Sequence, residues 1–155
     1  MNILFHFLFN YLFVDIVFGN AWDYLVVVFV FSVLIDLTHL PYLLRVRKDV
    51  MKKRFGSGSR TRFHEIYGLT LFSAVICVLY LVFDPIIIGV IAMCIVLHFA
   101  IDFLTGKSMP FYPYSKKEVF LRISPYGYKE KILFETFSTI LLVVLFWLKV
   151  GSLVL

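Results

Sequence analysis

Two pairs of histidine and aspartate stand at helical spacing in otherwise apolar stretches of the chain. Asp36 and His39 are three residues apart, and His98 and Asp102 are four residues apart. On an α-helix these spacings place both members of a pair on one side. Neutral imidazole and ionised carboxylate are ligands for divalent transition metals, and the charge of a bound ion offsets the cost of burying a carboxylate. The two pairs therefore predict a metal site shared between helices.

The elements that must carry these residues are apolar enough to lie in a membrane. Of the 155 residues, 61% are hydrophobic and 16% are charged, whereas soluble domains have about 45–50% apolar and about 25% charged residues. A segment that spans lipid must satisfy its own backbone hydrogen bonds, as a helix does. We therefore predict an all-α fold, a polytopic bundle of about five transmembrane helices that forms a single integral membrane domain over residues 1–155. The helices are expected at about residues 2–18, 24–44, 66–83, 86–104 and 132–150.

Basic residues set the orientation of this bundle. Of the 15 lysines and arginines, eight lie in the loop of residues 45–65 and six in the loop of residues 105–131, with Lys149 as the exception. Because basic residues concentrate on the cytoplasmic side of membrane proteins, both loops and the N-terminus are predicted to be cytoplasmic. The expected location is the inner (plasma) membrane. The net charge of +5 then reflects topology and contact with membrane lipids, and no nucleic acid partner is expected.

All four histidines converge on the cytoplasmic face in this topology. His6 lies near the start of the first helix, and His64 stands just before the third. The candidate metal ligands are His6, Asp36, His39, His64, His98 and Asp102. The alternative is structural, because a buried His–Asp pair on a membrane helix also forms a hydrogen bond that ties helices together.

Two further features concern structure rather than chemistry. Cys77 and Cys94 lie inside apolar runs without metal-binding spacing, so both are expected to be small core residues. The segment from Ser115 to Glu118 has the form of a capping box, which predicts a short helix lying on the membrane surface.

The residues around the second His–Asp pair resemble a known family. They are similar to the HxxxDxxT…P…PxS signature of the YdjM-like inner-membrane metal-dependent hydrolases. The matching positions are His98, Asp102, Thr105, Pro110, Pro113 and Ser115. His6 matches a histidine near the N-terminus of that family. Asp36 and His39 match its D-x-D-H step, in which Thr38 replaces the second aspartate.

The family's HRxxTHS motif corresponds to the residues that precede the third helix. Arg60 and His64 match it, while Ser59 stands in the place of its first histidine. The resemblance covers about residues 1–115 and implies hydrolysis assisted by one or two divalent metal ions, with zinc preferred to manganese. Such an ion lowers the pKa of bound water and polarises a phosphoryl or acyl oxygen. In this interpretation Glu65 is the general base, and Arg60 holds an anionic group of the substrate.

Two functions remain open at this point. The first is a metal-dependent hydrolase at the cytoplasmic face of the membrane, acting on a phosphoester of a lipid or lipid-like molecule. The basic surroundings favour a phosphoester. The second is a non-enzymatic membrane protein whose His–Asp pairs are structural and whose basic loops bind anionic lipid or a partner. Metal transport ranks last, because it needs polar residues that continue across the bilayer. Toward the other face the acidic candidates are Asp15 and Asp84 alone.

Cysteine labelling tests the predicted topology. Single cysteines introduced at Ser57 and Lys116 should react from the cytoplasmic side, and one introduced at Ser152 from the outside, because the basic loops stay inside. The labelling is measured with an impermeant maleimide in a variant that lacks Cys77 and Cys94. Labelling of Ser57 and Lys116 from opposite sides would contradict the helix order and separate the candidate ligands.

Overall fold

The structure, a computed structural model, describes residues 2–37, 65–115, 117–121, 123, 125 and 128–154. Throughout these residues the regular elements are helices, which confirms the all-α prediction. They are α1 (Ile3–Phe18), the short 3-10 helix η1 (Ala21–Tyr24), α2 (Leu25–Leu37), α4 (Ile66–Tyr80), α5 (Pro85–Thr105) and α6 (Tyr128–Val154). The remainder of the helix expected at residues 24–44 lies outside the described residues.

Two of the helices are long and apolar enough to cross a membrane. They comprise 21 residues over Pro85–Thr105 and 23 residues over Lys129–Gly151. At about 1.5 Å per residue, each of them reaches the thickness of a hydrocarbon core, which is about 30 Å. Ile3–Phe18 and Ile66–Tyr80 are also apolar but shorter. Large apolar side chains are exposed along α4 and α6, a surface that fits lipid rather than water.

Local residues fix where the helices begin. The side chain of Asn2 caps α1 by accepting a hydrogen bond of 2.7 Å from the backbone N–H of Phe5. Asp84 caps α5 in the same way, with a bond of 2.7 Å from Ile86, and Pro85 takes the first helical position, where no N–H is needed. α4 and α5 therefore form a helical hairpin, and Asp84 and Pro85 stand where its turn ends and α5 begins.

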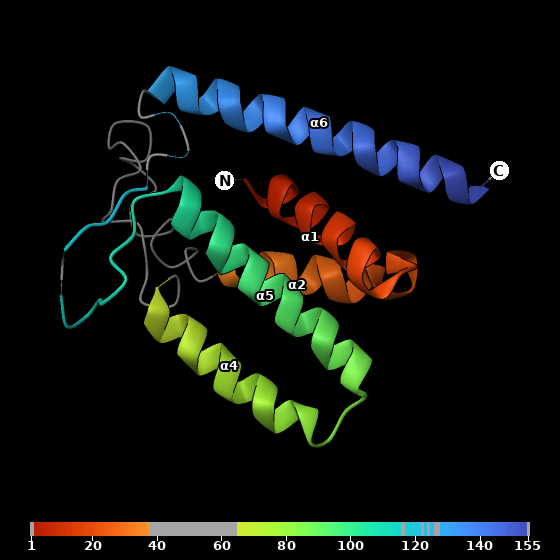
Figure 1. Ribbon diagram of the computed structural model, residues 1–155, viewed down its shortest axis with the longest axis horizontal. Coiled ribbons are helices and arrows are strands. Elements are labelled where there is room, and N and C mark those ends of the chain that lie inside the picture. Colours follow the sequence, from red (N-terminus) through yellow and green to blue (C-terminus); the bar gives the residue numbers. More distant parts are fainter. Residues whose placement is uncertain are drawn as a thin grey trace.

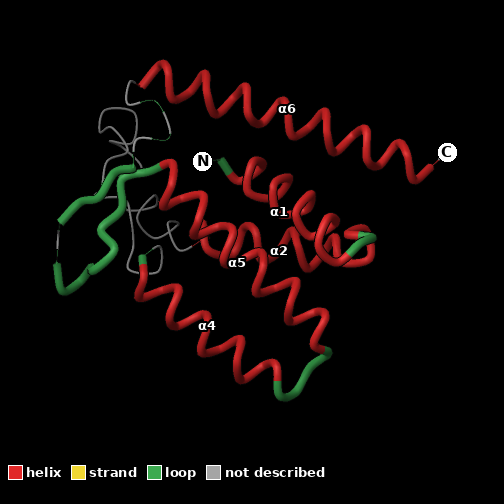
Figure 2. Tube along the Cα trace, in the orientation of Figure 1, coloured by secondary structure: helices red, strands yellow, loops and turns green. Residues whose placement is uncertain are grey.

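Helices α1, α2 and α5 pack against one another and form the centre of the bundle. α6 packs on α1, and α4 packs on α5, so these two helices flank the centre (Figure 1). Figure 2 shows that the N-terminal ends of α1, α4 and α6 lie at the same end of the bundle as the C-terminal ends of α2 and α5. The turns that join α1 to α2 and α4 to α5 lie at the other end.

The buried core follows this packing. One cluster lies between α1, α2 and α5 and includes Tyr11 and Cys94, and a second, around Ile35 and Ile95, is packed against α4. The expectation of a core cysteine is confirmed for Cys94. It is wrong for Cys77, which is exposed on α4. The reason is that α4 packs on α5 and leaves most of its other apolar side chains exposed.

The chain that follows α5 does not form the expected surface helix within its described residues. Ser108 and Val119 instead form an isolated antiparallel bridge, with backbone hydrogen bonds of 2.9 and 2.8 Å. These bonds hold the backbone extended at Val119, so pairing across the loop overrides the local capping signal at Ser115. Phe111 and Tyr114 are 64% and 92% exposed, which suits a loop at the depth of the lipid headgroups.

The ion pair that joins α1 to α6 can be tested by a double-mutant cycle. Lys149 Nζ lies 2.8 Å from Asp15 Oδ2, and Asp15 Oδ1 accepts a hydrogen bond of 3.1 Å from the backbone N–H of Ala21. We expect Lys149→Met and Asp15→Asn each to lower the midpoint of thermal unfolding in detergent. The unfolding midpoint of the double variant should be no lower than that of the less stable single variant, because both changes remove the same contact. Additive losses would contradict this pairing.

Candidate metal centre

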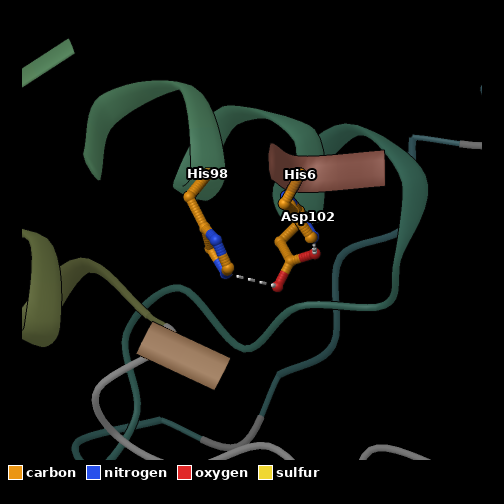
Figure 3. A group of neighbouring side chains, drawn as sticks. All are labelled: His6, His98 and Asp102. Carbon is orange, nitrogen blue, oxygen red and sulfur yellow. Dashed lines mark ion pairs between the residues drawn. The ribbon is translucent and has the colours of Figure 1, made fainter. Parts of the chain in front are cut away.

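A buried group of three side chains, His6, His98 and Asp102, joins α1 to α5 (Figure 3). His6 Nε2 lies 3.3 Å from Asp102 Oδ1, and His98 Nε2 lies 3.8 Å from Asp102 Oδ2. Each residue offers one donor atom, and these atoms lie within 4.8 Å of one another. The two imidazole rings stack with their centroids 4.0 Å apart and their planes 17° from parallel. Both histidines are fully buried, and Asp102 is 8% exposed.

The positions of these residues along their helices account for the convergence. His6 stands near the start of α1, whereas His98 and Asp102 stand near the end of α5, and these two helix ends lie together (Figure 2). The four-residue spacing of His98 and Asp102 puts both side chains on the face of α5 that meets α1. The two side chains therefore share one side of α5, as their spacing predicts, and metal binding by them stays a prediction.

Asp36 brings α2 to the same place. Its Oδ1 atom lies 3.6 Å from His98 Nε2, so this nitrogen is close to carboxylates from two different helices. The side chains of Asp36 and Asp102 are mostly buried, at 15% and 12% exposure. With Asp36 included, the centre draws on α1, α2 and α5.

The protonation of His98 follows from the contact of its other ring nitrogen. His98 Nδ1 lies 3.0 Å from the backbone carbonyl oxygen of Ser32. A carbonyl only accepts hydrogen bonds, so Nδ1 carries the proton, and the lone pair of the neutral ring is on Nε2. This lone pair is close to oxygens of Asp36 and Asp102. A cation among these groups makes such an arrangement favourable.

The donor set fits a divalent transition metal such as zinc. Imidazole nitrogen and carboxylate oxygen are donors that such ions bind, and the donor atoms of His6, His98 and Asp102 lie within 4.8 Å of one another, with His6 Nε2 3.3 Å from Asp102 Oδ1. Both ring nitrogens of His6 are buried and have no hydrogen-bond partner among the described residues, since Nε2 approaches Asp102 without hydrogen-bond geometry. Metal coordination satisfies a buried nitrogen of this kind, which is otherwise costly.

The structure brings together four of the predicted ligands, which are His6, Asp36, His98 and Asp102. Outside the described residues lie His39, His64 and Arg60. Glu65 is 4% exposed, and its Oε1 atom accepts a hydrogen bond of 2.9 Å from the backbone N–H of Met109. Glu65 thus ties the start of α4 to the loop after α5, and its role as a general base stays a prediction.

Two polar residues next to His98, Asn10 and Ser32, were not expected from the sequence. Both are fully buried, and Asn10 Nδ2 donates a hydrogen bond of 2.8 Å to Ser32 Oγ. Asn10 follows His6 by four residues and therefore shares its face of α1. The one available signal was a polar side chain within an apolar membrane helix, one turn from a candidate ligand.

Comparison with known proteins found a matching family. A family model described as YdjM inner membrane protein matches residues 1–154. The match therefore extends beyond the segment of residues 1–115 that carries the sequence motifs. No curated protein and no solved structure gave a match.

Elemental analysis of the purified protein tests the centre. We expect bound zinc in the wild type and at least about tenfold weaker zinc binding in His98→Ala and Asp102→Asn, because each change removes a donor. Asp15→Asn is the matched control, since it changes a carboxylate of α1 that pairs with Lys149. This control should keep the wild-type metal content. Equal metal content in all four proteins, or none in any, would contradict the assignment.

Proposed function

The chain belongs to the YdjM inner membrane protein family, and from this premise we propose that it is a membrane-bound metal-dependent hydrolase. The observation that carries the proposal is the buried group of His6, His98 and Asp102, whose donor atoms lie within 4.8 Å of one another. Each ionisable group inside a membrane protein costs free energy, so two imidazoles and a carboxylate at one point call for a function beyond packing.

The cytoplasmic face is our assignment for this centre. The donor residues lie at the end of the bundle that also carries the loop after α5 (Figures 1 and 3). That loop and the segment of residues 45–65 hold most of the basic residues, and such residues concentrate on the cytoplasmic side. The N-terminus, which lies at the same end, is cytoplasmic in this proposal.

Three residues would hold the ion, namely His6, His98 and Asp102. Zinc suits this mixture of nitrogen and oxygen donors, with manganese as the alternative. When bound, such an ion supplies a water molecule with a pKa of about 7 and polarises the oxygen of the scissile group. Asp36, also expected as a ligand, has its Oδ1 atom 3.6 Å from His98 Nε2, where it can accept a proton. Glu65 is the alternative base.

The surroundings of the centre support an anionic substrate at the membrane surface. The loop after α5 exposes Phe111 and Tyr114, and aromatic side chains favour the headgroup layer. Residues 105–131 carry six lysines and arginines and residues 45–65 carry eight, a positive charge that favours an anionic substrate. We propose a phosphoester of a lipid or lipid-like molecule as the substrate, with Arg60 binding its phosphate group.

Phosphate release from a lipid phosphoester in mixed micelles tests the hydrolase. The zinc-loaded protein should hydrolyse the ester, and a chelator should abolish the activity. Asp102→Asn should fall to the background rate because it loses a donor, yet keep its helical circular dichroism and stay near the wild-type midpoint of thermal unfolding. The reason is that packing across many contacts, rather than one side chain, holds the bundle together.

Asp15→Asn again serves as the control and should retain hydrolysis. The hydrolase would be refuted by a wild type that releases no phosphate or does so independently of chelator. If Asp102→Asn in addition unfolded several degrees below the wild type, the result would favour the structural alternative, in which the contact between His6 and Asp102 holds α1 to α5.

A further inference from the structure

A buried hydrogen-bond network joins the three central helices next to His98. Asn10 Nδ2, on α1, donates to Ser32 Oγ on α2 at 2.8 Å and to the backbone carbonyl of Cys94 on α5 at 3.2 Å. Because a carbonyl oxygen only accepts hydrogen bonds, the NH₂ group of the Asn10 amide must point toward the Cys94 carbonyl. The orientation of the amide is therefore fixed. All three residues are fully buried.

The network ends on the ring of His98. The backbone carbonyl of Ser32 accepts the hydrogen bond from His98 Nδ1 at 3.0 Å. Cys94 precedes His98 by four residues on α5, and Asn10 follows His6 by four residues on α1. The network therefore lies about one helical turn from the candidate metal centre. Asn10 thus holds both the residue that orients the His98 ring and the turn of α5 before it.

Packing alone does not account for Asn10. Its Oδ1 atom is buried and has no hydrogen-bond partner among the described residues, and an unpaired buried acceptor destabilises a protein. Leucine has the same number of side-chain heavy atoms in the same branched arrangement and has no polar group to leave unpaired. The reason for an amide at this position is therefore the pair of hydrogen bonds that its N–H groups donate to Ser32 Oγ and to the Cys94 carbonyl.

We infer that Asn10 is a positioning residue that fixes the tautomer and the direction of His98 for metal binding. By holding Ser32, it keeps the Ser32 carbonyl against the Nδ1–H group, so that His98 Nε2 presents its lone pair toward Asp36 and Asp102. Histidine ligands commonly donate their second N–H to a carbonyl in this way. The inference rests on the proposed metal-dependent function, but the hydrogen bonds can be examined without any reaction.

Nitrogen-15 NMR of the histidine rings in metal-free protein provides the test, with His98 assigned by the loss of its signals in His98→Ala. The wild type should carry the His98 proton on Nδ1 when the ring is neutral, whereas in Asn10→Leu the proton should be distributed over both nitrogens. Zinc affinity, measured by calorimetry on the same samples, should fall by about 10–100-fold.

Thr139→Val is the matched control for this experiment. It removes a different side-chain hydrogen bond, which Asn2 Nδ2, at the N-cap of α1, donates to Thr139 Oγ1 on α6 at 3.1 Å. Both the His98 tautomer and the zinc affinity should stay at their wild-type values. A change equal to that in Asn10→Leu would overturn the inference, because it would show a general effect of loosening α1.

Two other outcomes would overturn the inference: a wild-type His98 with its proton on Nε2, or a folded Asn10→Leu protein with unchanged tautomer and affinity. If Asn10→Leu does not fold, Ser32→Ala decides by the same readouts, since it removes the Oγ atom that Asn10 holds and keeps the carbonyl. A protein that shows the expected changes but hydrolyses no phosphoester would refute the hydrolase and still support the role of Asn10.

Discussion

The burial of carboxylates beside two imidazoles is the constraint on which the rest of this structure depends. Asp36 and Asp102 are largely buried, and both approach His98 Nε2. An aspartate buried within a membrane helix costs free energy, about 2.5–3.5 kcal/mol at the helix centre and less toward the ends where these two stand, so compensating groups must come together around it. They come from α1, α2 and α5, and these three helices are also the ones that pack closely against one another. The close packing of these three helices thus holds the polar centre together.

The helical architecture could be predicted largely from the sequence, because the requirement is simple. Apolar stretches of sufficient length must become helices in lipid, and the observed bounds of α1, α5 and α6 lie within a few residues of those expected. The start of α5 at Pro85 lies one residue from the bound expected from the sequence, because Asp84 caps the helix and proline suits its first position. The exposure of Cys77 could not be predicted, since a side chain that faces lipid and one that faces the core have the same apolar character.

The candidate site could be predicted in part. The spacing of His98 and Asp102 fixed a shared helix face, and the positive-inside rule brought His6 to the same end of the bundle. The stacking of the two imidazole rings at 4.0 Å could not be predicted, because it depends on how α1 and α5 are rotated about their axes. Asn10 was missed for a similar reason, since its spacing of four residues from His6 does not show that tertiary contacts bring Ser32 on α2 and the Cys94 carbonyl on α5 beside it.

The outer placement of α4 and α6 has a consequence for the behaviour of the protein in bilayers of different thickness. Membrane helices accommodate hydrophobic mismatch largely by tilting, and tilt is set by packing against neighbours. Each outer helix packs chiefly on a different central helix, and among the described residues neither supplies a donor to the group of His6, His98 and Asp102. Tilting of α4 and α6 can therefore absorb changes in lipid chain length. The separations between donor atoms then depend on the packing of the three central helices.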